Sequence, residues 1–173
     1  TLASNTTASN NTAVGNNALA ANTTGHSNNA VGATALDANT TGNGLNAFGY
    51  GALGANTTAD GNSAFGHETL LANTTGANTT ADNNTAVGKD VGKVITTGDR
   101  NTFVGSLAGD ATDDGIGNTA VGYLALSANC GNTNTAVGIE CLTACTGATN
   151  TAMGQDAGGS VTSGGNNLLL GYQ

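Results

Sequence analysis

The sequence predicts an all-β protein, a parallel β-solenoid (β-roll or β-helix) of about ten coils of 16–17 residues. Three observations predict it: a glycine that recurs at a near-constant spacing, a short apolar pair before each of those glycines, and a composition dominated by small, turn-forming residues. Only 8% of the 173 residues are charged and 3% are aromatic, and Pro and Trp are absent. An ordinary enzyme domain rarely has this composition.

The repeat is marked by the motif Asn-x-Ala-Val-Gly and its close variants. Successive repeat glycines are 17, 17, 17, 22, 17, 17, 16, 16 and 17 residues apart. Low charge and many small residues would also fit a disordered chain, but a fixed period over the whole chain argues against disorder. The repeat glycines are Gly15, Gly32, Gly49, Gly66, Gly88, Gly105, Gly122, Gly138, Gly154 and Gly171.

The element expected before each repeat glycine is a short β-strand. Apolar runs of two or three residues are too short for a helical stripe, and the adjoining glycine weakens a helix. Most coils carry a leucine four residues after the glycine, followed by a polar turn. Coils stacked at ~4.8 Å would align identical side chains in ladders, and we expect Val/Phe and Leu ladders inside. The apolar pairs are Ala13-Val14, Ala30-Val31, Ala47-Phe48, Ala64-Phe65, Ala86-Val87, Phe103-Val104, Ala120-Val121, Ala136-Val137 and Ala152-Met153.

The domain organisation follows from the repeat. Residues 1–10 are expected to start a coil or to cap the stack, and residues 11–173 to form one solenoid domain. Between Gly66 and Gly88 the spacing grows to 22 because a turn unit is duplicated. The excess should bulge outward as a loop at residues 72–83, with Asn73, Thr75, Asn78 and Thr80 as its exposed positions.

Each apolar pair consists of two successive residues, and successive residues in a strand point to opposite sides of the sheet. One member of the pair should therefore line the interior while the other points outward. Association with further copies of the chain would cover the outward residue. The alternative is that small outward residues stay exposed at little cost.

The motifs Asn11-Thr12-Ala13-Val14-Gly15, Asn84-Thr85-Ala86-Val87-Gly88 and Asn118-Thr119-Ala120-Val121-Gly122 resemble the head repeats of YadA-like trimeric autotransporter adhesins. They also resemble Asn-Thr-Ala-Val-Gly repeats of phage tail-fibre and bacterial surface proteins. The resemblance covers roughly residues 11–171 and implies a trimeric, left-handed parallel β-roll that serves in adhesion or as a fibre shaft. The period is longer than that of the adhesin heads, so each coil carries a longer turn.

Charge and hydropathy narrow the function classes. Lys89, Lys93 and Arg100 are the three cations, and the net charge is −8, which excludes a phosphate-neutralising nucleic-acid surface. Apolar runs of about three residues cannot span a bilayer, so no membrane insertion is expected in this segment.

Catalytic constellations are not apparent, and we expect neither an enzyme nor a cofactor or metal. His26 and His67 occupy different phases of the coil, and Glu68 and Glu140 belong to coils that are not neighbours, which argues against a general acid–base pair. The acidic turn at Asp110, Asp113 and Asp114 lacks the bidentate Glu of an EF-hand, which favours an ordinary turn over a cation site.

Three cysteines lie in two adjacent coils. Cys130 and Cys145 differ by one residue in phase, so stacking should bring them close, and we predict a disulfide between them in an oxidising exterior. The alternative is a pair of unbridged small residues in a ladder. Cys141 takes the inward alanine position and should be a buried free thiol.

Asn-x-Thr sequons recur along the chain, and four of them share one phase of the coil: Asn22, Asn39, Asn56 and Asn73. These four are candidate glycosylation sites that would project from one edge of the stack. The alternative is that Asn and Thr are good turn residues, multiplied by repeat duplication.

The leading functional interpretation is a structural or adhesive extracellular fibre segment, at a cell surface or on a virion. Its partners would be copies of itself, as a trimer or an end-to-end filament, and host-surface or matrix glycans or proteins. The alternative is an ice-binding or carbohydrate-binding β-solenoid, because a threonine ladder would run along the turns through Thr23, Thr40, Thr57, Thr74 and Thr96. That ladder is broken at Asp113 and Cys130. A carbohydrate-processing β-helix enzyme would need clustered carboxylates and aromatic platforms, which the scattered aromatic residues do not provide.

Overall fold

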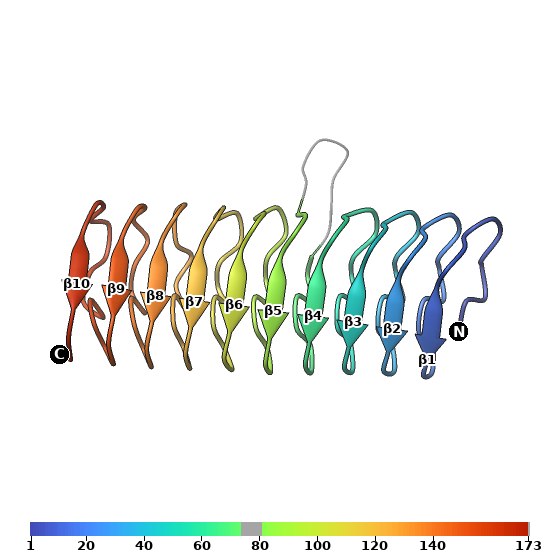
Figure 1. Cartoon of the computed structure of the whole chain (residues 1–173), viewed down its shortest axis with the longest axis horizontal. Coiled ribbons are helices and arrows are strands. Elements are labelled where there is room, and N and C mark those ends of the chain that lie inside the picture. The colour runs from blue at the N-terminus through green and yellow to red at the C-terminus, as the bar shows by residue number, and fades with distance from the viewer. Residues whose placement is uncertain (74–80, 173) are drawn as a thin grey trace.

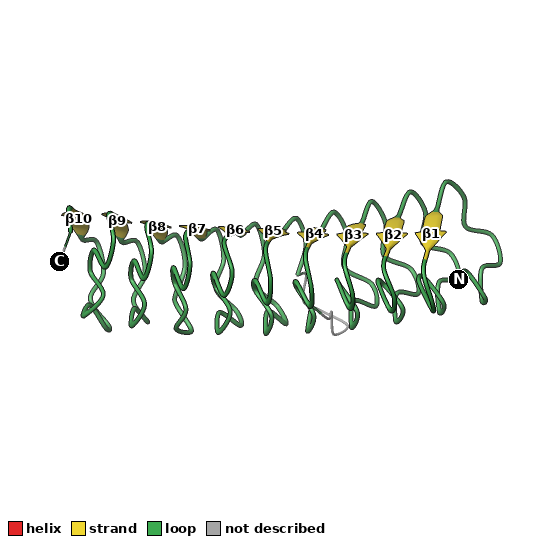
Figure 2. Ribbon diagram, turned by 90° about the horizontal axis from the view of Figure 1, so that it is seen from below, coloured by secondary structure: helices red, strands yellow, loops and turns green. Residues whose placement is uncertain are grey.

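The computed structural model describes residues 1–73 and 81–172. It is a β-solenoid of about nine turns, and no helix lies within the described residues. The described residues form ten three-residue strands. These strands make up one side of an elongated stack, and turns close each coil on the other sides (Figures 1 and 2). The strands are β1 (Thr12–Val14), β2 (Asn29–Val31), β3 (Asn46–Phe48), β4 (Ser63–Phe65), β5 (Thr85–Val87), β6 (Thr102–Val104), β7 (Thr119–Val121), β8 (Thr135–Val137), β9 (Thr151–Met153) and β10 (Leu168–Leu170).

The ten strands form a single parallel sheet in sequence order, each strand pairing with the next. The register follows the repeat, so that Ala13 lies beside Ala30 and Val31 beside Phe48. Backbone hydrogen bonds also join the turns of adjacent coils, as where the N–H of Leu36 donates to Ala52 O at 3.1 Å. The predicted fold class, strand positions and stacking are therefore confirmed.

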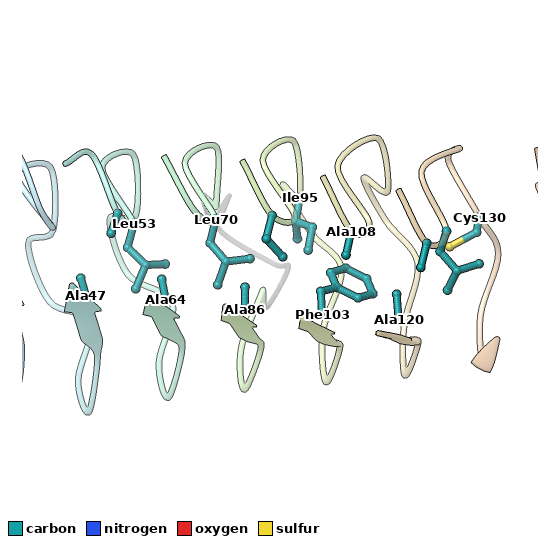
Figure 3. Packing of buried hydrophobic residues seen from close by; sticks show 14 of the residues in the cluster. Ala47, Leu53, Ala64, Leu70, Ala86, Ile95, Phe103, Ala108, Ala120 and Cys130 are labelled. Carbon is teal, nitrogen blue, oxygen red and sulfur yellow. The ribbon is translucent and has the colours of Figure 1, made fainter. Parts of the chain in front are cut away.

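The core is a narrow, packed row of side chains that runs along the stack (Figure 3). It lies between the sheet and the buried leucines on the opposite side of each coil. The middle residue of each strand points inward, and the predicted leucine ladder is buried opposite it. The fully buried leucines of this ladder are Leu19, Leu36, Leu53, Leu70, Leu126 and Leu142. They adopt positive φ angles of 50–54°, a conformation that turns the chain sharply at each coil corner.

The predicted Val/Phe ladder inside the solenoid is wrong. In eight of the nine apolar pairs the alanine points inward, as Ala47 and Ala64 do at 0% exposure, whereas Phe48 and Phe65 are 37% and 40% exposed. The exception is Phe103, which points inward while Val104 is exposed. The physical reason is space: the core already holds one leucine per coil, and only a methyl group fits beside it at most coils. In these eight pairs the larger member is left on the outer surface.

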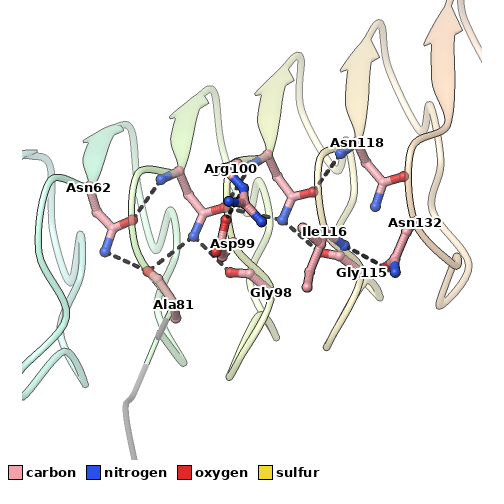
Figure 4. A network of polar contacts seen from close by, with 11 residues as sticks. Asn62, Ala81, Gly98, Asp99, Arg100, Gly115, Ile116, Asn118 and Asn132 are labelled. Atoms are coloured by element: carbon pink, nitrogen blue, oxygen red, sulfur yellow. Dashed lines mark hydrogen bonds and ion pairs between the residues drawn. The ribbon is translucent and has the colours of Figure 1, made fainter. Parts of the chain in front are cut away.

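A ladder of mostly buried asparagines runs beside the core (Figure 4). They occupy the residue preceding every described strand except β3, where Leu45 takes the position. The side-chain carbonyls accept the backbone N–H of the corresponding residue in the next coil, as where Asn101 Oδ1 accepts from the N–H of Asn118 at 2.8 Å. Most of the amide groups donate to a turn carbonyl, as Asn101 Nδ2 does to Gly115 O at 2.8 Å, whereas Asn118 Nδ2 is buried without a partner among the described residues. Because burial of unpaired polar groups is costly, this network fixes the position of each turn relative to the strands of its own coil and the next.

The 22-residue spacing leaves the sheet undisturbed, because Ser63 of β4 pairs directly with Thr85 of β5. Asn73 is fully buried, which corrects its assignment as an exposed loop position. Its amide donates to Ala81 O at 3.2 Å, so the chain closes the coil at these two residues. The other three positions assigned to this loop, Thr75, Asn78 and Thr80, lie outside the described residues.

Residues 1–10 lie on the first coil. The N–H of Leu2 donates to Ala18 O at 3.2 Å and that of Ser4 to Ala20 O at 3.1 Å, which is the bonding pattern between later coils. None of the described segments is a helix with the length and hydropathy needed to cross a membrane.

Candidate functional surface

The outer side of the sheet is the most distinctive surface of the described chain. We call it the sheet face and define it by the first and third residues of every strand. None of the residues in the ten described strands is charged. The first-position ladder is mostly Thr, Asn and Ser, and the third-position ladder is Val14, Val31, Phe48, Phe65, Val87, Val104, Val121, Val137, Met153 and Leu170. These two ladders give the solenoid an uncharged, half-apolar surface along its whole length.

Eight of the ten third-position side chains are substantially exposed, from 36% for Val104 to 69% for Leu170, and Val31 and Val137 are half-buried. Two residues further along the chain, at the edge of the sheet face, several coils add another exposed apolar side chain. These edge residues are Tyr50, Tyr123, Ile139 and Tyr172, with exposures of 45–80%. Contiguous exposed apolar area of this kind marks interaction surfaces in proteins.

Four aromatic residues of two neighbouring coils interrupt the aliphatic ladder. Phe48 and Phe65 stack with ring centroids 5.1 Å apart and planes 7° from parallel. Tyr50 and His67, at the edge, stack at 5.2 Å and 23°. We call these four residues the aromatic quartet. Its members were visible in the sequence as departures from the repeat, but their placement together follows only from the in-register stacking.

A charged cluster adjoins the quartet. Lys93 Nζ lies 2.5 Å from Glu68 Oε2 and 3.2 Å from Asp90 Oδ1, and Lys89 Nζ lies 2.8 Å from Asp90 Oδ2. The hydrogen bond from Lys89, with a further one from Lys93, holds the pKa of Asp90 below its usual value. The hydrogen bond to Glu68 and that to Asp90 raise the pKa of Lys93.

The ligand atoms of His67, Glu68 and Asp90 lie within 4.8 Å of one another, a grouping that could hold a metal ion. The ammonium of Lys93 already bridges the two carboxylates, and Lys89 holds one of them. A metal would have to displace these ion pairs from a cluster whose formal charges cancel, so the donor set does not favour a cation. Arg100 pairs with Asp99 at 2.7 Å, which leaves each of the three cations of the chain bound to a carboxylate.

The turn threonines proposed for ice binding are engaged inside the stack. Thr23 Oγ1 donates to Thr40 O at 3.0 Å, and Thr40 Oγ1 donates to Thr57 O at 3.1 Å. Thr96 Oγ1 bonds to the carboxylate of Asp113. Thr74 lies outside the described residues. The hydroxyls of Thr23, Thr40 and Thr96 therefore serve coil-to-coil contacts and are not free to bind a ligand.

A different threonine ladder is free. The first-position residues of β5 to β9 are all threonine, and none of their hydroxyls bonds to another described residue. They are Thr85, Thr102, Thr119, Thr135 and Thr151. The sequence did not reveal this ladder, because the hydropathy pattern does not show which strand residues point inward and which point outward.

All three cysteines are buried free thiols, so the predicted Cys130–Cys145 disulfide is not formed, whereas the free, buried Cys141 is confirmed. Cys130 and Cys145 lie in neighbouring coils, but their sulfur atoms engage different partners. Cys130 Sγ lies 3.2 Å from Thr112 Oγ1, and Cys145 Sγ accepts from Asn150 Nδ2 at 3.4 Å. Burial is the main cause that raises the pKa of Cys130 and of Cys141.

The four candidate glycosylation sites are wrong for the folded chain, because all four side chains are fully buried: Asn22, Asn39, Asn56 and Asn73. They form a second buried ladder in the turns. Asn39 Nδ2, for example, donates to Asn22 Oδ1 at 2.9 Å and to Gly42 O at 3.1 Å. Their shared phase therefore reflects a structural position rather than a modified edge.

The remaining ionisable groups do not converge on a reacting centre within the described residues. Glu68 is paired with Lys93, and Asp113 accepts from the backbone N–H of Thr96 at 3.2 Å. Burial, with a smaller contribution from the charge of Asp90, raises the pKa of Asp110. A scan against protein-family models finds no match, and neither curated proteins nor solved structures give one.

Proposed function

We propose that this chain is a rigid segment of an extracellular fibre, on a cell surface or a virion, that associates with copies of itself and serves in attachment. The observation that supports the proposal most directly is the sheet face, where an uncharged apolar ladder is exposed along the described stack. A water-soluble monomer rarely leaves such a surface uncovered.

The size of the sheet face fits this role. Ten strands at ~4.8 Å spacing and three residues at ~3.3 Å each give roughly 500 Å² per copy. Two copies would bury about 1,000 Å², the lower end for a specific protein contact. The exposed edge residues Tyr50, Tyr123 and Ile139 would enlarge it. A trimer is the arrangement that the adhesin resemblance implies, and an end-to-end filament is the other arrangement proposed.

The attachment partners proposed are host-surface or matrix glycans or proteins, not nucleic acid. This choice rests on charge: each of the three cations is held by a carboxylate of the same chain, and the net charge is −8. A phosphate backbone would find no free cation on the described surface. We propose no catalytic role.

Sedimentation velocity tests the self-association. The wild-type chain should sediment as an oligomer at micromolar concentration, and the variant Val104→Glu/Val121→Glu should sediment as a monomer because it places charges on the sheet face. The matched control is Thr24→Glu/Thr41→Glu, which adds the same charge on exposed turns and should remain oligomeric. A wild-type chain that stays monomeric would contradict the proposal.

Ice binding is a second candidate, favoured by the free threonine ladder of β5 to β9. Regularly spaced hydroxyls beside valine methyl groups, on a backbone held rigid by parallel pairing, form a surface suited to ordered water. Thermal hysteresis measured on the wild type and on Thr119→Tyr tests it. Ice activity that the substitution abolishes would support this candidate, and ice growth as in buffer alone would exclude it.

A further inference from the structure

A periodic sheet face leaves the alignment of two associated copies undefined. Each coil repeats the outer pattern of the one before it, so a copy displaced by one coil, or ~4.8 Å, meets a nearly identical surface. Flat repetitive pairings specify register weakly for this reason. If the chain associates through the sheet face, as proposed above, something must distinguish one alignment from its neighbours.

We propose that the aromatic quartet fixes this alignment, so that copies of the chain associate in parallel with quartet against quartet. The third-position residues Phe48 and Phe65 stand where eight other coils carry Val, Met or Leu. At the edge, Tyr50 and His67 stack on each other beside them. The four aromatic rings are therefore a non-repeating mark on two adjacent coils.

Exposure makes the quartet available to a second copy. Phe48, Phe65 and Tyr50 are 37%, 40% and 53% exposed, and His67 is exposed as well. Their stacking within the chain fixes the ring orientations before association, so little side-chain freedom remains to be lost. Aromatic pairs contribute beyond the area that they bury. A displacement by one coil would replace part of the aromatic contact with aliphatic contact and would leave rings exposed.

The neighbouring charges permit parallel alignment. In that arrangement each coil meets its own counterpart, so the cluster of Glu68, Lys89, Asp90 and Lys93 lies near its copy. Its two carboxylates and two ammonium groups are paired within the chain and their formal charges cancel. Two such clusters can therefore lie next to each other without repulsion between net charges. The role resembles that of a single polar residue that sets the register of a coiled coil.

Cross-linking at defined coils tests the alignment. Single cysteines are placed on the sheet face as Thr151→Cys, Thr135→Cys or Asn29→Cys, away from the quartet. The variants are mixed in pairs and treated with a short bismaleimide, with unsubstituted chain as the control for the buried native cysteines. Peptide mass spectrometry then counts the pairs. Links of 151 to 151 report parallel alignment in register, links of 151 to 135 a one-coil displacement, and links of 151 to 29 an antiparallel arrangement.

In the otherwise wild-type chain, 151-to-151 links should exceed 151-to-135 links at least tenfold. The variant Phe48→Val/Phe65→Val/Tyr50→Ala/His67→Ala replaces the four rings with aliphatic side chains and should stay oligomeric while that ratio falls severalfold. Tyr123→Ala removes an aromatic outside the quartet and should leave the ratio unchanged. An oligomer whose ratio does not depend on the quartet, or whose links are mainly 151 to 29, would overturn this inference alone. A wild-type monomer in sedimentation would overturn the proposed self-association together with it.

Discussion

Phe103 occupies space that Gly109 leaves open in the same coil. A Cβ atom built on Gly109 would lie 2.4 Å from Phe103 Cε2, so any side chain at residue 109 would collide with the ring. Phe103 is the one inward strand position in the described coils with an aromatic residue, and it is 1% exposed. At the position of Gly109 most coils carry the buried leucine instead. Most coils combine an inward alanine on the strand with a buried leucine, whereas this coil combines Phe103 with Gly109. The total side-chain volume in the core is therefore similar.

The first prediction exchanges this pair. Phe103→Ala alone should destabilise the chain by about 3–5 kcal/mol through the cavity it leaves, and Gly109→Leu alone by about 1–3 kcal/mol or more through overpacking. The double variant restores the common pair of the repeat and should recover most of the loss, because Leu126 shows that leucine accepts the required positive φ. Urea denaturation measures all three. Additive losses in the double variant would contradict the proposed exchange of volume.

The second prediction concerns the asparagine ladder. Asn101→Ala should lower the free energy of unfolding by about 2–4 kcal/mol, because the N–H of Asn118 and the carbonyl of Gly115 would both lose their partner. Asn16→Ala, at an exposed position, is the control and should change stability by less than about 0.5 kcal/mol. Equal effects of the two substitutions in chemical denaturation would show that the ladder does not stabilise the fold.

The third prediction is a pH dependence at Asp110. Burial raises the pKa of this carboxyl in the folded state above its usual value. Its ionised form therefore opposes folding, and the stability associated with the protonated form is lost as pH rises through the folded pKa. Asp110→Asn should be more stable than the wild type at pH 7, and this advantage should disappear on acidification below the usual Asp pKa of about 4.

Melting temperatures of Asp110→Asn, measured across that pH range, check this sign. The matched control is Asp114→Asn, an exposed acid in the same coil. An Asp110→Asn variant that is less stable than the wild type at pH 7 would show that the carboxylate makes a favourable contact that outweighs its burial.

The fourth prediction concerns the thiols. Cys130, Cys141 and Cys145 are buried, and burial raises the pKa of Cys130 and Cys141, which lowers the reactive thiolate fraction. In the native chain, alkylation by N-ethylmaleimide should proceed only at the rate of unfolding, and in denaturant all three should react at once. Intact mass without reduction should show three alkylated cysteines after denaturation, whereas a mass lower by two labels would reveal a disulfide.

The fifth prediction is a deletion. Removing residues 77–81 joins Gly76 to Asp82 and recreates the turn sequence Asn-Thr-Thr-Gly that follows Ala38. There the carbonyl of Gly42 accepts from Asn39 Nδ2, so Gly76 can supply the acceptor that Ala81 supplies to Asn73. The melting temperature should change by no more than a few degrees. A collapse of stability would show that the duplicated turn unit is packed against the stack.

The sequence by itself determined the elements and their order. The spacing of the glycines and the apolar pairs before them predicted every one of the ten strands, because a short apolar run beside a glycine suits a strand and because a fixed period aligns the coils. It also predicted the buried leucine ladder and the buried thiol of Cys141. These properties depend only on local conformation and on the phase of the repeat, and both follow from the linear sequence.

Only the tertiary structure decided which side of each strand faces the core. Ala47 and Phe48 are both apolar, so the hydropathy pattern does not orient them, and the width left beside Leu53 selects the smaller residue. The same reason explains Asn39, whose sequon suggested an exposed turn although its amide is buried against the next coil. The aromatic quartet exists only because stacking places residues 17 apart in contact. Inward and outward directions, and the surfaces they create, follow from the volume enclosed by the coils, which no single repeat specifies.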